Sequence, residues 1–169
     1  VLAIDRDTDA INRVRDRLGM DARLRVAKGN FADMVAIAKQ HAVDAVDGIV
    51  LDLGVSSEQL DTGARGFSFD HDGPLDMRMD RAQALTAETI VNDRDAQTLG
   101  EILRTLGEER QARRIARAIV KAREGRPLRT TGQLAEVVAR AVGGRRGRIH
   151  PATRTFQALR IAVNDELGA

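Results

Sequence analysis

Residues 52–80 read DLGVSSEQLDTGARGFSFDHDGPLDMRMD and are the most informative stretch of this chain. They follow GIVL at residues 48–51, an apolar run typical of a buried parallel strand. The stretch has almost no helical or strand periodicity, but apolar residues such as Phe67, Phe69 and Met77 recur among its polar ones, which predicts an ordered loop. In α/β proteins, an ordered polar loop at the carboxyl end of a strand is where ligands bind.

The residues before this loop predict alternating strands and helices. Residues 1–4 form an apolar strand that ends at Asp5, and a helix capped by Thr8 or Asp9 and stopped by Gly19 follows it. A short strand is expected at residues 24–26, a second helix over 32–40, and a third strand over 48–53. The inward positions of the first helix are Ile11, Val14 and Leu18. This β-α-β-α-β order predicts an α/β fold with a parallel sheet.

After the loop, the apolar period becomes helical. The pattern predicts one helix over 99–107, a second from about 108 to 123, and a third from Thr130, where Gln133 completes a capping box, to about 142. A last helix begins near Pro151 and has Phe156, Leu159, Val163 and Leu167 on one face. We therefore expect an all-helical insertion at 82–150 between the first part of the α/β core, 1–81, and a return helix, 151–169. Three strands make a thin sheet, so we also expect a chain that lacks the first β-loop-α unit and the closing strands.

Composition excludes several classes of protein. The chain has 169 residues, no cysteine and three histidines without metal-ligand spacing, so we expect neither disulfides nor a metal site. No apolar run suggests a membrane span and no signal peptide is visible, so the cytoplasm is the expected location. Aromatic residues make up 2% of the chain, all of them Phe, which argues against an RNA-binding sheet of stacked aromatics.

The charge is divided unevenly along the chain. Residues 1–84 carry 11 Lys and Arg against 15 Asp and Glu, a net of −4, and residues 85–169 carry 16 against 10, a net of +6. The helix after residue 108 concentrates cations on about a third of its circumference, opposite its apolar face. Like charges at these spacings destabilise an isolated helix, and a polyanion would relieve the repulsion. The nucleic-acid contact candidates are Arg110, Arg113, Arg114, Arg117 and Lys121, with Arg145, Arg146, Arg148 and Arg154.

Four residues are candidates for binding a small ligand. Asp5 ends a strand where an acid can accept both hydroxyls of a ribose, and Phe31 follows the second strand where it can lie against an adenine. Asp52 ends the third predicted strand, and Gln59 could reach back to the same ligand. Each residue also has a purely structural interpretation, such as a helix-terminal acid for Asp5 or a core side chain for Phe31.

Three long strings suggest a family. They are residues 52–80, GEERQARRIARAIV at 107–120 and HPATRTFQALRIAVNDEL at 150–167. Together with the opening AIDRD, they resemble the bacterial small-subunit ribosomal RNA cytosine-N4 methyltransferases, the RsmH or MraW family. The strings follow the order of that family and extend over the length of the chain.

The resemblance implies a class I methyltransferase, in which a Rossmann-like core binds S-adenosyl-L-methionine and an inserted helical domain recognises the substrate. It implies rRNA methylation at the N4 of a cytidine in the decoding region of 16S ribosomal RNA, within the small ribosomal subunit. By position, the cofactor contacts of the family fall on Asp5, Phe31, Asp52 and Gln59. The Gly-Gly-His turn that the family uses for the cofactor lies outside this sequence.

Catalytic roles are hypotheses at this stage. The amine of cytosine is a weak nucleophile because its lone pair is delocalised into the ring, so it must be held in line with the methyl group. We expect Ser56 and Ser57 to orient the amine and Asp76 and Arg78 to shape the base pocket. Two alternatives remain open: an NAD-dependent Rossmann oxidoreductase, and a non-catalytic protein that binds RNA or the ribosome.

Overall fold

The computed structural model describes residues 1–19, 21–144 and 149–168 as two compact units. The first unit contains Val1–Leu53 and Met79–Gln83, together with residues 167–168, and the second contains Gly54–Arg78 and Ala84–Glu166. The described chain combines a small parallel sheet with many helices, which confirms the predicted α/β class. The predicted boundaries at residues 81 and 150 stay predictions.

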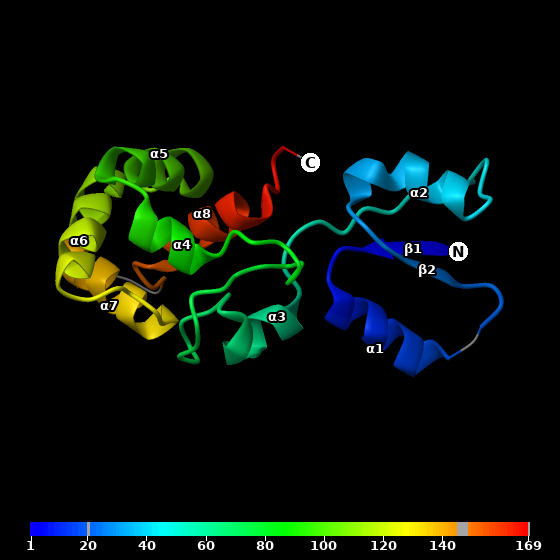
Figure 1. The fold of residues 1–169 in the computed structure, drawn as a ribbon, viewed down its shortest axis with the longest axis horizontal. Coiled ribbons are helices and arrows are strands. Elements are labelled where there is room, and N and C mark those ends of the chain that lie inside the picture. The colour runs from blue at the N-terminus through cyan, green and yellow to red at the C-terminus, as the bar shows by residue number, and fades with distance from the viewer. Residues whose placement is uncertain (20, 145–148, 169) are drawn as a thin grey trace. The chain divides into compact units, whose positions relative to one another are not determined.

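The first unit is built on two parallel strands, β1 (Leu2–Asp5) and β2 (Arg25–Lys28). Helix α1 (Thr8–Leu18) connects them, and the 3-10 helix η1 (Phe31–Asp33) leads from β2 into α2 (Met34–Gln40). In Figure 1, α1 lies below the strands and α2 above them, as in a layered α/β unit. The buried apolar residues of this unit are few: Ile11, Ala27, Ile37 and Met79.

Details of α1 differ from the sequence prediction. Asp7, rather than Thr8 or Asp9, caps the helix, and its side chain accepts a hydrogen bond from the backbone N–H of Asp9 at 3.0 Å. Gly19 ends the helix with φ of 62°, as predicted. Leu18 was predicted to face inward but is exposed.

The predicted third strand is wrong for the described chain. Residues 48–53 form no regular structure, and the side chain of Val50 is 93% exposed. A strand exists only where a neighbour accepts and donates its backbone hydrogen bonds, and the two described strands pair with each other alone. The apolar run is therefore present, but it lies outside the sheet.

The second unit is helical. It consists of α3 (Ser57–Asp61), the 3-10 helix η2 (Gly63–Arg65), α4 (Ala87–Asp93), α5 (Ala96–Gly107), α6 (Ala112–Gly125), α7 (Thr131–Val142) and α8 (Thr153–Asn164). Helix α5 packs against both α6 and α8, and α6 packs against α7. Their shared core contains Leu99, Leu103, Ile115, Ile119, Leu134, Val138 and Leu159, all fully buried. Figure 1 shows α4 to α8 gathered around this core.

The four long helices of this unit were predicted, and the short α3 and α4 were missed. Helix α6 starts at Ala112 rather than near residue 108, because Glu108 adopts a left-handed conformation, with φ of 50°, that ends α5. Phe156, Leu159 and Val163 of α8 are buried as expected. Leu167 is exposed, because α8 ends at Asn164 and the helical spacing no longer applies beyond it.

The loop at residues 66–80 is tied to the start of α7. Leu75 donates its backbone N–H to the carbonyl of Arg129 at 3.0 Å, and Thr131 donates to the carbonyl of Gly73 at 2.8 Å. The carboxylate of Asp72 accepts from the backbone N–H of Gly132 at 2.8 Å, and this hydrogen bond is the main cause that lowers the pKa of Asp72. These bonds explain how a long loop stays ordered without its own secondary structure.

Gly107 lies where α5 packs against α8. A Cβ at this position would overlap the carbonyl oxygen of Arg154 and lie 2.8 Å from the Cβ of Ala158. Only a glycine leaves room for this contact, so the spacing of the two helices depends on it.

We expect Gly107→Ala to lower the free energy of unfolding by about 1–3 kcal/mol, because helix backbones must shift to admit the methyl group. Chemical denaturation followed by circular dichroism measures the change. Gly125→Ala is the matched control: nothing lies within 4 Å of its added Cβ. It should leave stability unchanged or raise it by up to about 1 kcal/mol. Equal effects of the two variants would contradict this account of Gly107.

Candidate functional site

Asp5 and Phe31 lie at the same edge of the two-stranded sheet. Asp5 is the last residue of β1 and pairs in register with Lys28, the last residue of β2, and Phe31 begins η1 three positions later. The backbone N–H of Gly29 donates to the carbonyl of Asp5 at 2.9 Å, which fixes the turn after β2 against the end of β1. Since the strands are parallel, both carboxyl ends meet at this edge.

The side chains at this edge suit a nucleoside. Asp5 is exposed, and one of its carboxylate oxygens accepts from the backbone N–H of Asp7 at 2.7 Å, which orients the group. An oriented carboxylate can accept hydrogen bonds from ribose hydroxyls, and a half-buried ring such as that of Phe31 can lie against a base. The accepting carboxylate and the aromatic ring therefore fit the nucleoside part of a cofactor.

An ion pair lies near the end of β2 in the same unit. The ammonium group of Lys28 is 2.9 Å from the carboxylate of Asp80, and this bond is the first cause that lowers the pKa of Asp80. Asp52, the third predicted cofactor residue, is exposed in the irregular segment 48–53. The assignment of Asp52 to the cofactor stays a prediction.

Gln59 and Ser56 form the start of α3 in the second unit. The Ser56 hydroxyl accepts from the backbone N–H of Gln59 at 3.2 Å, and the Gln59 side chain accepts from the backbone N–H of Ser56 at 3.0 Å. The two side chains form a capping box at the start of α3, and Gln59 is buried. Ser57, next to the cap, is exposed. Gly54 has φ of 130°, so the turn before α3 needs a glycine.

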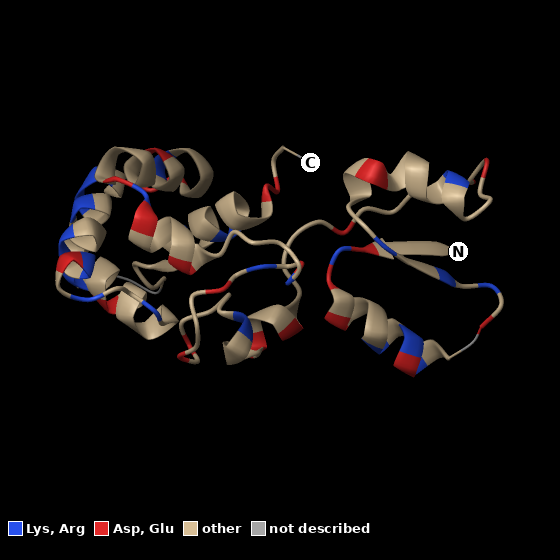
Figure 2. Ribbon diagram, in the orientation of Figure 1, with Lys and Arg blue, Asp and Glu red and all other residues tan. Residues whose placement is uncertain are grey.

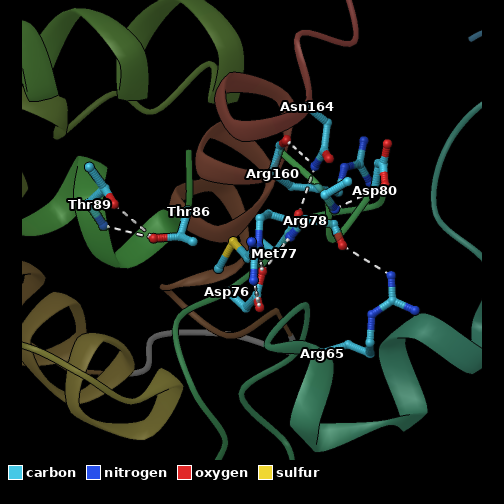
Figure 3. A network of polar contacts seen from close by, with 10 residues as sticks. Arg65, Asp76, Met77, Arg78, Asp80, Thr86, Thr89, Arg160 and Asn164 are labelled. Carbon is cyan, nitrogen blue, oxygen red and sulfur yellow. Dashed lines mark hydrogen bonds and ion pairs between the residues drawn. The ribbon is translucent and has the colours of Figure 1, made fainter. Parts of the chain in front are cut away.

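Asp76 and Arg78 interact with each other. The guanidinium of Arg78 approaches the two carboxylate oxygens of Asp76 at 2.7 and 2.9 Å, and both side chains are mostly buried (Figure 3). A bidentate pair of this kind is rigid and electrically compensated. Asp76 is therefore held as a structural acceptor, and the predicted role of this pair in a base pocket stays a prediction.

The backbone between Asp76 and Arg78 is held by two buried side chains. Asn164 of α8, 1% exposed, donates its amide to the carbonyls of Met77 at 2.7 Å and Arg160 at 2.9 Å. Arg65, also buried, donates to the carbonyl of Arg78 at 3.0 Å (Figure 3). Met77 has φ of 61°, an uncommon conformation for a residue with a side chain, which these contacts hold in place.

No structural role was predicted from the sequence for Asn164 or Arg65. For Asn164 a signal was available: it continues a helix in which Phe156, Leu159 and Val163 face the core, and a polar residue beside such a stripe is buried only with a partner. That partner lies 87 residues away in the sequence and could not be identified from the pattern.

The cationic residues of α6 lie on its exposed side. Arg113, Arg114, Arg117 and Lys121, with Arg110 just before the helix, are all exposed, and we call these five residues the cationic stripe. The core side of the helix is formed by Ala112, Ile115, Ala116 and Ile119. Figure 2 shows the basic positions along α6. Within the described ranges, no ion pair compensates a member of the stripe.

The other basic candidates fall outside this stripe. Arg154 is exposed on the first turn of α8, and its guanidinium donates to the carbonyl of Glu108 at 3.1 Å. Arg145, Arg146 and Arg148 lie outside the described residues. The described part of the chain contains no cluster of three or more acidic or histidine side chains that could hold a metal ion. Its helices include none that is both long and apolar enough to cross a membrane.

The fold and the nucleoside-type edge agree with a comparison of the chain with known families. The model of the MraW methylase family matches residues 1–169, and the chain belongs to that family. This membership favours a methyltransferase over the oxidoreductase alternative.

Individual relatives carry a more specific name. The chain is 48% identical to the ribosomal RNA small subunit methyltransferase H of Symbiobacterium thermophilum over 172 residues, which cover all of this chain and 54% of the relative. It is 54% identical to the protein of the same name from a Methylobacterium species, with 99% of this chain and 50% of the relative covered. It is 51% identical to the protein of that name from Geobacter sulfurreducens, with 100% of this chain and 55% of the relative covered. The chain spans about half the length of these curated relatives.

We expect Asn164→Ala to lower the free energy of unfolding by about 1–3 kcal/mol, because the buried carbonyl of Met77 would lose its hydrogen bond. Thermal and chemical unfolding measure the loss. Gln97→Ala is the control, since Gln97 is exposed on α5 and its amide donates to the exposed carboxylate of Glu101 at 3.2 Å. If both substitutions changed stability by the same small amount, the proposed role of Asn164 would be wrong.

Proposed function

We propose that this protein transfers a methyl group from S-adenosyl-L-methionine to the N4 of a cytidine in the decoding region of 16S ribosomal RNA, in the small ribosomal subunit. The observation that carries the proposal is membership of the MraW methylase family over residues 1–169. It is supported by identities near one half to proteins named for methylation of small-subunit ribosomal RNA. The oriented Asp5 and the cationic stripe are the structural features that suit this chemistry.

We assign the cofactor to Asp5, Phe31, Asp52 and Gln59. Asp5 would accept from the ribose hydroxyls and Phe31 would lie against the adenine, both from the carboxyl edge of β1 and β2. Asp52 lies in the irregular segment 48–53, and Gln59 follows it seven residues later in the sequence. The cofactor supplies the electrophilic methyl group, and these residues would hold and orient it.

The protein must orient the acceptor amine. The lone pair of the cytosine amine is delocalised, so the rate depends on holding the amine in line with the methyl group and on acceptors for its hydrogens. Ser56 and Ser57 are the proposed acceptors. The Ser56 hydroxyl already accepts from the N–H of Gln59, but a hydroxyl oxygen has a second lone pair. The turn carbonyls next to Gly54 would complete the set.

We propose that the helices of residues 82–150 recognise the substrate and that the cationic stripe contacts phosphates. Five exposed Arg and Lys side chains without described ion pairs keep their charge available for a polyanion. Contacts to phosphates supply affinity and salt dependence, and base contacts elsewhere must supply specificity. The stripe would thus bind the RNA phosphates that flank a base flipped out of its stack.

Mass mapping of 16S ribosomal RNA tests the function. RNA from cells with the gene should contain N4-methylated cytidine in the decoding region, and RNA from cells without it should lack this modification at the same position. Full-length protein with labelled S-adenosyl-L-methionine should transfer labelled methyl groups in vitro to small subunits from cells that lack the gene. Unchanged methylation without the gene would refute the proposal. Retained RNA binding without cofactor binding would instead support the non-catalytic alternative.

The acceptor role of the serines has its own measurement in the full-length enzyme. Ser56→Ala and Ser57→Ala should each lower the single-turnover rate of methyl transfer by about tenfold, with cofactor affinity retained, because each removes one acceptor that holds the amine in line. Thermal unfolding controls for Ser56→Ala, which also removes the cap of α3. Wild-type rates in both variants would exclude this role.

Neutralising the cationic stripe should weaken RNA binding in a salt-dependent way. Arg113→Ala and Arg117→Ala should each reduce the slope of log affinity against log salt by about 0.7–0.9, because each removes one phosphate contact. Arg140→Ala on α7 is the matched control, since this exposed Arg is already paired with Glu136. Filter binding to a decoding-region RNA over a salt series measures the slopes. Equal slopes for the stripe variants and the wild type would contradict the assignment.

A further inference from the structure

A groove of about 480 Å³ opens in the second unit between α8 and the segment that contains α3 and the loop after η2. Its volume lies within the range of pockets that bind small molecules. None of the residues predicted to bind the cofactor or the phosphates lines it. Its lining includes Asp61, Phe67, Phe69, Asp70, Phe156, Gln157 and Arg160.

Most of the aromatic side chains of the protein line the groove. The chain has four Phe and no Trp or Tyr, and three of the four Phe line this one groove. The ring of Phe69 lies 4.9 Å from that of Phe156 in an edge-on arrangement and 4.5 Å from the ring of His150. Phe67 and Phe156 are buried and Phe69 is half-buried, so Phe69 is a fixed ring that remains partly accessible. Such a ring can stack against a planar ligand.

The charges of the groove exclude a phosphate. Asp61 and Asp70 line it and are exposed, and they would repel an anion. Arg160, the one Arg or Lys in the lining, is paired with Glu166 through two hydrogen bonds of 2.9 Å. Ionised carboxylates accept hydrogen bonds only, so a ligand here must present N–H or O–H donors. The amide of Gln157 can both donate and accept, as the edge of a nucleobase requires.

We propose that this groove holds one unstacked nucleobase of the RNA substrate that carries an exocyclic amino group, cytosine or adenine. Phe69 supplies the stacking surface, Asp61 and Asp70 accept from the amino group, and Gln157 pairs with the remaining edge. The cationic stripe grips phosphates by charge, and the groove selects a base by its donors. This inference rests on the proposed RNA substrate but not on the chemistry of methyl transfer.

Binding of short single-stranded oligonucleotides to the full-length protein tests the groove. Oligocytidylate and oligouridylate of equal length differ along one edge of the base: cytosine has an amino group and an N3 acceptor where uracil has a carbonyl and an N3–H donor. The wild type should bind oligocytidylate more tightly. Phe69→Leu, which keeps an apolar side chain beside Phe156, should weaken oligocytidylate binding by about tenfold. The double variant Asp61→Asn and Asp70→Asn should bring the ratio of the two affinities close to one, because an amide can donate to the uracil carbonyl.

Controls separate this inference from folding and from the proposed function. Glu136→Gln, an exposed carboxylate on α7 outside the groove, should leave the affinity ratio unchanged. Thermal unfolding verifies each fold, and Gln157→Ala replaces Phe69→Leu if that variant unfolds; it too should weaken oligocytidylate binding. Wild-type oligocytidylate affinity in these groove variants would overturn the proposal, as would a loss of S-adenosyl-L-methionine affinity with RNA affinity intact. A protein that discriminates the two oligonucleotides through the groove but transfers no methyl group would contradict the proposed function alone.

Discussion

The hydrogen bond from the Asn164 amide to the carbonyl of Met77 anchors the end of the ordered loop, whose earlier part is held by the start of α7. It joins the last helix to a residue in the left-handed region, and both partners are fully buried. An unpaired buried carbonyl would cost free energy comparable to a lost hydrogen bond, so the loop has one favourable conformation. Through that conformation the Asp76–Arg78 pair, the buried Arg65 and the segment that lines the aromatic groove take their positions.

The second unit carries two surfaces of different character. Helix α6 presents uncompensated cations on one side and packs its apolar side into the bundle. The groove beside α8 has rings and carboxylates, and its only cation is already paired. A surface that is uniformly basic binds nucleic acid without preference, whereas a carboxylate next to an aromatic ring can distinguish bases by their donors. This division suits the proposed function, in which a long polyanion is bound and one of its bases is methylated.

The local sequence pattern correctly predicted the features that depend on neighbouring residues. The first two strands, the four long helices, the stop at Gly19 and the capping box at Thr130 followed from periodicity and cap chemistry. The exposure of the cationic stripe followed from helical spacing. The strand at 48–53 was wrong because a strand depends on a neighbour, which no local pattern reveals. The sequence did not predict that Asp76 pairs with Arg78 or that Asn164 bonds to Met77, because tertiary packing determines both contacts.

The exposed run at residues 48–53 has a consequence for solubility. Ile49, Val50, Leu51 and Leu53 are all more than half exposed in the described structure, and Asp52 is the only charge among them. A short β-prone segment with one charge and no proline has the composition of segments that assemble into intermolecular sheets. Among the described residues this backbone has no ladder partner, and a second copy of the same segment could supply one. Self-association at high concentration is therefore the hazard that this segment creates for the chain.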